Sequence, residues 1–336
     1  MEIPQAGERF ARLGPAPAGS GDPAAASPVS AGDVAAARAP AWRRIARVAG
    51  AYVALMKPRI IILLLITTLA AMVLAEGGWP PAGLVVATLL GGFLAAGGAN
   101  SINQYLDRDI DEVMRRTRRR PLPSHRVAPW HALRFGVLLG SAAFVLLALA
   151  VNLLAAFLAI TGLLFYVIVY TLWLKRSTPQ NIVIGGAAGA IPPLVGWAAV
   201  TGTIDLLPLY LFAIVFFWTP PHFWALALLL KRDYAEARVP MLPVISGEAE
   251  TKRQILLYTL LLVAVTALPF AARALGGWYL VAALALGTVL IGHAVGLIRG
   301  AERAWARRLF LFSNLYLALL FTAMIVDRVI MHGGTP

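Results

Sequence analysis

The chain has 336 residues, of which 60% are hydrophobic and 13% are charged, whereas about a quarter of a typical soluble domain is charged. A soluble fold of this length cannot hide so much apolar surface, so the composition indicates a protein embedded in a bilayer. The net charge of +13 is carried by short loops between apolar segments, which argues against nucleic-acid binding. Because the chain has no cysteine, disulfides, thiolate metal sites and a cysteine nucleophile are excluded.

The N-terminal segment is rich in Ala, Pro and Gly and lacks the apolar core of a signal peptide. We therefore expect a disordered tail over 1–45 and a transmembrane domain over 46–332. Nine stretches of this domain are apolar and long enough to span a bilayer. They are 59–76, 83–104, 131–150, 153–173, 181–201, 206–230, 254–272, 277–298 and 308–330. The fold class expected is all-α, a polytopic membrane protein with nine transmembrane helices.

Lys and Arg residues are distributed unevenly between the two sides of this topology. The segment before the first span and the loops after spans two, four, six and eight carry nearly all of them, whereas the opposite loops contribute Arg273 and Arg328. By the positive-inside rule, the N-terminus and the basic loops are cytoplasmic. We expect a multi-pass protein of the bacterial cytoplasmic (inner) membrane, favoured over the mitochondrial inner membrane.

Acidic residues are scarce, yet three lie close together at the end of the second span: Asp107, Asp109 and Asp111. Helix positions four apart share a face, so Asn103, Asp107 and Asp111 form one stripe while Asp109 points elsewhere. Like charges at this spacing repel one another unless a cation binds, and oxygen-only ligands suit Mg²⁺. The alternative is an exposed helix end whose aspartates pair with nearby arginines.

Five arginines follow the stripe within residues 115–120. Guanidinium groups beside a metal-binding carboxylate stripe are typical of a diphosphate site, because the metal bridges phosphate oxygens and Arg clamps them. The alternative is that these arginines only set the topology or bind anionic lipid.

The pattern Asn103-x3-Asp107-x3-Asp111, followed by Arg116-Thr-Arg-x-Arg120-Pro-Leu, resembles the first motif of the UbiA superfamily of intramembrane prenyltransferases. Three further motifs resemble its protohaem IX farnesyltransferase branch. They are YTxxLKR at 170–176, WTPPHFWALA at 218–227 and KxDYxxAxxPMLP at 231–243. Many members carry a second DxxxD motif, but here Asp233 is followed by Ala237 at that spacing, which leaves a second metal short of ligands.

The resemblance implies nine helices in a ring around a central cavity. It implies transfer of farnesyl from farnesyl diphosphate to a vinyl group of haem b with addition of water, giving haem O and diphosphate for cytochrome oxidase biogenesis. Mg²⁺ is the expected cofactor. Haem b and farnesyl diphosphate are the expected substrates, and membrane lipid and haem A synthase are candidate partners.

From this resemblance we expect Mg²⁺ to be held by Asn103, Asp107 and Asp111. The expected catalytic residues are Asn103, Asp107, Asp111, Lys175 and Tyr170. The expected substrate-binding residues are Arg116, Arg120, Arg176, His222, Lys231, Asp233, Tyr234 and Tyr166. Among them, Arg116, Arg120, Lys175 and Lys231 are the candidates for a diphosphate clamp, and Arg176 is one candidate for a haem propionate.

Aromatic faces stabilise an allylic cation, and Tyr166 and Tyr170 lie four residues apart near the cytoplasmic end of span four. An interfacial aromatic belt is the alternative for both. His222 follows two prolines inside span six, where its imidazole either ligates haem iron or hydrogen-bonds a propionate. The alternative is that it satisfies backbone carbonyls freed by the prolines.

Three other functions compete with haem farnesylation. Another enzyme of the UbiA type, acting on an aromatic or quinone precursor, would share the first motif but not the later ones. A transporter would carry ionisable residues near the bilayer midplane and show paired repeats, whereas this acidic cluster lies at one surface. A haem-binding chaperone would tolerate the loss of Asp107.

Overall fold

The computed structural model describes residues 40–331, with side chains described as far as Val329. Most of the tail expected over 1–45 lies outside the described residues, and α2 (Ala41–Met56) begins within its last part. The chain divides into two units, Met1–Ile45 and Ala46–Pro336. The arrangement described below is that of the second unit.

Every regular element of the described residues is helical, and nine helical segments are long and apolar enough to cross a membrane, which confirms the predicted fold class. The spanning elements are α3 (Pro58–Glu76), α4 (Ala82–Leu106), α6 (Pro129–Ala150), α7 (Leu153–Leu164) continued by η1 (Phe165–Leu174) and α8 (Lys175–Ser177), α9 (Asn181–Thr201), α10 (Leu206–Leu229), α13 (Gly247–Thr266) continued by α14 (Leu268–Ala271), α15 (Gly277–Arg299) and α16 (Glu302–Val326) continued by η2 (Asp327–Met331). Three short helices, α5 (Arg108–Val113), α11 (Lys231–Glu236) and α12 (Leu242–Ile245), lie in the loops.

Two spans begin earlier than the sequence predicts, at Gly247 and Glu302 instead of 254 and 308. Both helices begin with a charged turn, and a search for apolar runs leaves charged residues out of a span. Just beyond the first turn of α13, Lys252 forms an ion pair of 2.7 Å with Glu302 in the first turn of α16. The charged turns are therefore folded parts of the bundle and not loop.

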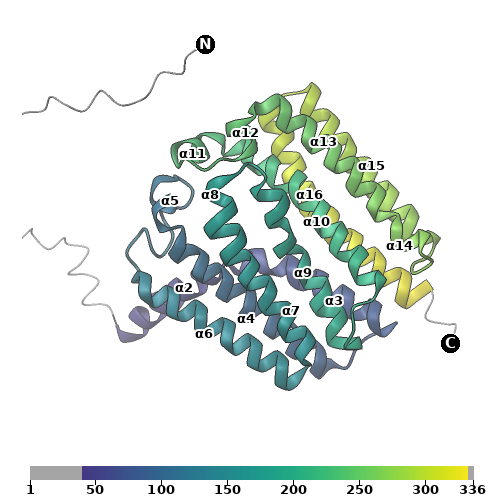
Figure 1. Ribbon diagram of the computed structural model, residues 1–336, viewed down its shortest axis with the longest axis horizontal. Helices are drawn as coiled ribbons and strands as arrows, with labels where there is room; N and C mark the ends of the chain where they lie inside the picture. Colours follow the sequence, from purple (N-terminus) through teal and green to yellow (C-terminus); the bar gives the residue numbers. More distant parts are fainter. Residues whose placement is uncertain (1–39, 332–336) are drawn as a thin grey trace, which may run out of the picture. The chain divides into compact units, whose positions relative to one another are not determined.

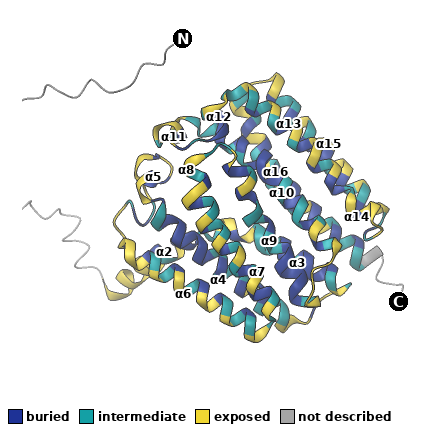
Figure 2. Ribbon diagram, viewed as in Figure 1, coloured by how far each residue is buried: buried dark blue, intermediate teal, exposed yellow. Residues whose placement is uncertain are grey.

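Successive spanning helices pack against one another in chain order, and α16 packs against α3, which closes a ring (Figure 1). Helix α9 also contacts α3, and α10 contacts α16. Accordingly, α10 is the most buried span, whereas α6 and α15 expose apolar side chains on their outer faces (Figure 2). Exposed apolar faces are expected where lipid is the solvent.

Small residues allow close helix contacts in the half of the ring that carries the acidic stripe. A Cβ added to Gly98 in α4 would lie 2.7 Å from the Gly136 carbonyl oxygen in α6. A Cβ added to Gly136 would in turn lie 2.9 Å from the Gly98 carbonyl oxygen. Backbones this close are characteristic of small-residue packing in membranes.

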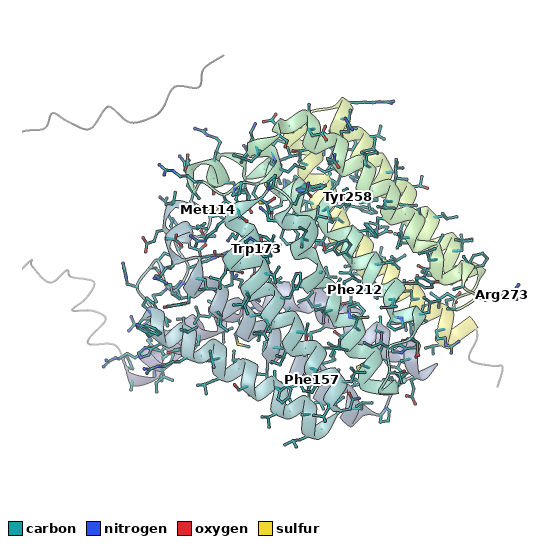
Figure 3. The ribbon with its side chains drawn as sticks, in the orientation of Figure 1. Met114, Phe157, Trp173, Phe212, Tyr258 and Arg273 are labelled. Atoms are coloured by element: carbon teal, nitrogen blue, oxygen red, sulfur yellow. The ribbon has the colours of Figure 1, made fainter. Side chains whose placement is uncertain are left out.

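The short helices α5, α8, α11 and α12 gather at one end of the spans (Figure 1), which we call the motif end. The backbone N–H of Arg116 donates to Asp233 Oδ2 over 3.4 Å, which links the loop after α5 to α11. Met114 and Tyr234 belong to one buried apolar cluster beneath these loops. Met114 and Trp173 mark this end in Figure 3.

Candidate active site

The acidic stripe keeps its helical spacing across a break between two helices, α4 and α5. Helix α4 ends at Leu106, and Asp107 has φ −92° and ψ 10° between α4 and α5. The Asp107 N–H still donates to the Asn103 carbonyl over 2.9 Å, and the Asp111 N–H to the Asp107 carbonyl over 2.8 Å. Because the four-residue spacing continues, all three side chains stay on one face. As whole residues, Asn103, Asp107 and Asp111 are 3%, 0% and 2% exposed, so they do not form a solvated helix end.

Cationic side chains from two other segments neutralise the aspartates of this buried stripe. Lys175 Nζ lies 2.5 Å from Asp107 Oδ2. Arg120 Nη1 donates to both Asp111 carboxylate oxygens over 2.8 Å. Such charge-assisted contacts are needed because an unpaired carboxylate is costly to bury. Lys175 and Arg120, two members of the predicted diphosphate clamp, therefore lie directly at the stripe.

Lys57, which the sequence reasoning used only for topology, joins the same cluster. Its Nζ donates to Asn103 Oδ1 over 3.0 Å. Its backbone has φ 57°, a left-handed conformation that is uncommon outside glycine and often found at functional sites. Burial, reinforced by the nearby Arg120 charge, lowers the pKa of Lys57 to about 7. The available sequence signal was a lysine directly before Pro58, which starts the first span.

The stripe offers a donor set that fits Mg²⁺. Asp107 Oδ1 is buried without a hydrogen-bond partner, and Arg176 Nη2 stands 3.7 Å away from it. Mg²⁺ is typically bound through one or two carboxylates together with substrate phosphates. Within residues 40–329 no cluster of three His, Cys, Asp or Glu side chains is arranged for a metal. Asn103 and the oxygens of a ligand would therefore have to complete a site built on Asp107 and Asp111.

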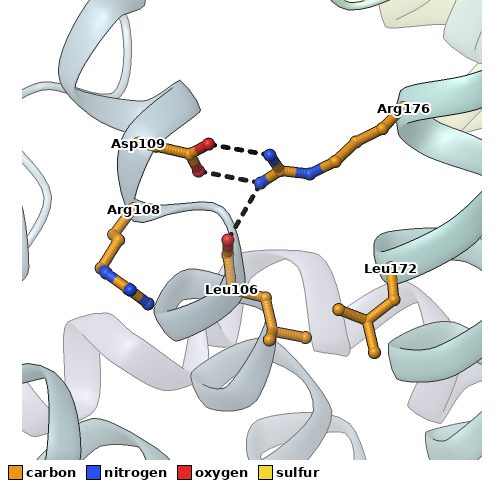
Figure 4. Close-up of a pocket in the computed structure, with 5 residues that line it drawn as sticks. All are labelled: Leu106, Arg108, Asp109, Leu172 and Arg176. Carbon is orange, nitrogen blue, oxygen red and sulfur yellow. Dashed lines mark hydrogen bonds and ion pairs between the residues drawn. The ribbon is translucent and has the colours of Figure 1, made fainter.

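Asp109 lies off the stripe, as predicted from its spacing. Arg176 binds it with two parallel hydrogen bonds of 2.8 Å and also donates to the Leu106 carbonyl over 3.0 Å (Figure 4). The hydrogen bonds from Arg176 lower the pKa of Asp109 to about 2. An open pocket beside the pair is lined by Leu106, Arg108, Asp109, Leu172 and Arg176 (Figure 4).

The predicted tyrosines lie close to the stripe. Tyr166 and Tyr170 are stacked with ring centroids 5.4 Å apart. The Tyr170 ring packs so tightly on α9 that a Cβ at Gly185 would collide with it. Tyr234 is buried, which raises the pKa of its hydroxyl. Tyr166 and Tyr170 are half-buried and pack against the buried apolar clusters of the bundle.

Other predicted binding residues lie away from the stripe. Lys231 Nζ binds Glu248 Oε1 over 2.6 Å, so this member of the expected clamp is held by α13. The Arg116 side chain is exposed, and its backbone makes the contact with Asp233 described above. The structure thus places Lys175 and Arg120 at the stripe, with Lys231 and Asp233 at the neighbouring loop.

His222 lies in a separate aromatic cluster between α10 and α16. Its ring stacks on Trp218 at 4.4 Å and on Phe310 at 4.7 Å. Its Nδ1 lies 2.7 Å from Ser313 Oγ, and Ser313 Oγ donates to the Phe310 carbonyl over 2.8 Å. A hydroxyl has one proton, so Nδ1 must be the donor to Ser313. Nε2 is therefore the nitrogen with a free lone pair.

Comparison with solved structures supports this fold. A chain from a study of digeranylgeranylglyceryl phosphate synthase matches with a TM-score of 0.69 at 20% identity, over 84% of this chain and 99% of that one. A UbiA homologue from Archaeoglobus fulgidus, bound to GPP and Mg²⁺, matches with a TM-score of 0.58 at 16% identity, over 82% of this chain and 99% of that one. At these identities the likeness concerns the fold alone.

Sequence relatives are much more similar. "Protoheme IX farnesyltransferase" of Symbiobacterium thermophilum is 58% identical over 82% of this chain and 93% of its own length. The protein of the same name from Roseiflexus sp. (strain RS-1) is 56% identical over 83% of this chain. The chain spans about half the length of this Roseiflexus relative, 52%. The profile of the UbiA prenyltransferase family matches residues 64–318. The chain, whose described residues contain nine candidate spans and the buried acidic stripe, belongs to the UbiA prenyltransferase family.

Proposed function

We propose that the protein transfers farnesyl from farnesyl diphosphate to a vinyl group of haem b, with addition of water, to give haem O and diphosphate. The observation that carries the proposal is the buried, oxygen-only stripe of Asn103, Asp107 and Asp111 with Lys175 and Arg120 against it. This arrangement suits a metal-bound diphosphate, and relatives named for haem farnesylation share more than half of the aligned residues. The homologue solved with GPP and Mg²⁺ has the same fold.

In this proposal Asn103 Oδ1, Asp107 and Asp111 would hold Mg²⁺, which supplies charge neutralisation at the leaving diphosphate. Lys175 and Arg120 bind the diphosphate oxygens and stabilise the negative charge that develops as the C1–O bond of the farnesyl group breaks. The electron pair of that bond leaves with the diphosphate. Because these cations lie at buried carboxylates, their charges act in a medium where they are weakly screened.

The allylic cation left behind needs shelter from water until the vinyl group reacts. Tyr166 and Tyr170 provide stacked aromatic faces near the stripe, and buried Tyr234 helps to close this side. The vinyl π electrons form the new bond to C1 of the farnesyl group. Water then bonds to the cation beside the porphyrin ring and releases a proton. No covalent bond to the protein is required at any step.

Haem b would be oriented by groups outside the stripe. Arg176 is a candidate for a propionate, whereas Arg116 and Lys231 remain candidates for the diphosphate clamp, and Asp233 lies beside Arg116. His222 presents the tautomer that can ligate iron, because Ser313 engages Nδ1. We propose that His222 faces the haem, either as an iron ligand or as a hydrogen-bond partner of a propionate.

The setting proposed for this reaction is the bacterial cytoplasmic (inner) membrane, with the motif end facing the cytoplasm. The support is the concentration of Lys and Arg in the loops of that end. Production of haem O for cytochrome oxidase biogenesis is part of this proposal, with a haem A synthase as a candidate partner.

The test uses purified full-length protein in detergent with haem b, farnesyl diphosphate and Mg²⁺, followed by mass spectrometry of the haem. We expect a product heavier than haem b by one farnesyl group plus one hydroxyl group. It should be lost with EDTA and in Asp107→Asn, but retained in Asp109→Asn, the same change two residues away on an exposed side chain.

Other results would point elsewhere. Prenylation of 4-hydroxybenzoate in place of haem would indicate another enzyme of this family. Haem binding without a product would favour a chaperone, and flux across proteoliposomes without chemistry would favour a transporter. A product that forms equally well in Asp107→Asn would keep the reaction but remove the role of the stripe.

A further inference from the structure

The fourth span changes its helical winding next to the acidic stripe. Phe165–Leu174, η1, is a π-helix of 10 residues inside an otherwise α-helical span. π-Helical turns are rare and occur often at functional sites. Within η1, the Thr171 hydroxyl donates to the carbonyl of Tyr166, five residues earlier, over 2.9 Å. Thr171 is fully buried, and its hydroxyl proton is committed to this bond.

The Thr171 oxygen can then only accept a second hydrogen bond, and it accepts one from Asn103 Nδ2 over 3.1 Å. The same Nδ2 donates to Asp107 Oδ2 over 2.7 Å. A carboxylate also has no proton to give. Rotating the amide by half a turn would therefore set its oxygen against two acceptors. Together, Thr171 and Asp107 fix which end of the Asn103 amide faces which way.

The other end of the amide faces a cation. Asn103 Oδ1 accepts from Lys57 Nζ over 3.0 Å, so the oxygen points to a place that favours positive charge. Asp107 Oδ2 is itself shared with Lys175 and belongs to the proposed metal ligands. Of the two acceptors that hold Nδ2, Thr171 is thus the one outside the proposed ligand set.

We propose that Thr171 is a positioning residue that fixes the Asn103 amide with its oxygen toward the metal. This inference rests on the Mg²⁺ site of the proposed function. The amide nitrogen cannot ligate a metal, so an amide free to rotate would offer the metal an oxygen only part of the time. The π-helical winding places the Thr171 hydroxyl between the Tyr166 carbonyl and the Asn103 amide.

The test measures Mn²⁺ binding by the electron paramagnetic resonance signal of the free ion, using full-length protein with the unreactive analogue farnesyl thiolodiphosphate. Thr171→Val keeps the shape and removes the hydroxyl. We expect it to weaken Mn²⁺ binding by about 10-fold or more, the usual effect of losing a residue that orients a metal ligand. Thr171→Ser keeps the hydroxyl and should bind Mn²⁺ as the parent does.

A matched control is Thr259→Val, because Thr259 is also fully buried and its hydroxyl donates to a carbonyl of its own helix, that of Ile255, over 2.7 Å. It should leave Mn²⁺ binding unchanged. In activity assays, Thr171→Val should raise the Mg²⁺ concentration needed for half-maximal turnover without changing the KM for haem. A purely structural role would not produce this split.

Three outcomes separate the two proposals. If the parent binds Mn²⁺ no better than Asp107→Asn, the metal site of the proposed function fails. If the parent binds well and Thr171→Val binds equally well, the positioning role is overturned. Weak binding by Thr171→Ser would overturn it too, because the hydroxyl is still present, and this variant decides the question should Thr171→Val not fold.

Discussion

The contact between Lys175 and Asp107 should contribute far more to the stability of the folded protein than the contact between Lys231 and Glu248. Both ammonium groups were expected to bind diphosphate, and both lie within 2.6 Å of a carboxylate oxygen. The Lys175 and Asp107 side chains are 13% and 1% exposed, whereas those of Lys231 and Glu248 are 38% and 43% exposed. Burial, not distance, separates the two pairs.

The expected losses in free energy of unfolding follow from this difference in burial. Removing one partner of a buried ion pair costs about 3–5 kcal/mol, because the other charge stays buried and uncompensated. Lys175→Met should lower the free energy of unfolding by about 3 kcal/mol, the lower end of this range, because Asp107 keeps its 2.7 Å hydrogen bond from Asn103 and has Arg176 at 3.7 Å. Lys231→Met removes an exposed pair and should cost about 0–1 kcal/mol.

The assay is SDS-induced unfolding from detergent micelles without added divalent cation, which yields the free energy of unfolding of each variant. A second arm adds Asp107→Asn to Lys175→Met. Because the amide is uncharged, the double variant should recover part of the loss. Equal destabilisation by the two lysine variants, or no recovery in the double variant, would refute the view that an uncompensated Asp107 charge dominates.

Two further predictions concern helix packing and His222, which we propose faces the haem. Gly98→Ala should cost about 1–3 kcal/mol, because its Cβ would press on the Gly136 backbone, whereas Gly292→Ala meets nothing within 4 Å and should be neutral or slightly stabilising in the same unfolding assay. Ser313→Ala should shift the Soret band of haem-loaded protein toward that of His222→Ala, because it removes the acceptor of the Nδ1 proton and frees the ring to change tautomer. An unchanged spectrum in both would count against His222 as an iron ligand.

Hydropathy alone was sufficient for the number and order of the spans, because each needs a long apolar run wherever its neighbours lie. It failed at the starts of α13 and α16, which are charged and are joined to each other through Lys252 and Glu302. An isolated window of sequence cannot show that a charged turn has a partner on another helix. The ends of these spans therefore depended on tertiary structure.

The stripe could be predicted because Asn103, Asp107 and Asp111 are related by local helical spacing. This four-residue spacing continues through the break at Asp107. The cations beside the stripe could not be predicted from local spacing. Lys57 and Lys175 reach the stripe from 46 and 68 residues away in the chain. No periodicity connects positions so distant, and only the motif with Lys175 gave a hint of its role.

The hydrogen bonds of Thr171 could not be predicted from the sequence. With α-helical spacing, its hydroxyl would be expected to bond a carbonyl three or four residues earlier, as Thr88 does with Leu84. The π-helical winding of η1 instead directs it to Tyr166 and leaves its oxygen to accept from Asn103. A change in winding of this kind leaves no mark in the spacing of apolar residues, because the whole stretch is apolar. The orientation of a single amide, on which the proposed metal site depends, is thus set by a feature that only the three-dimensional structure reveals.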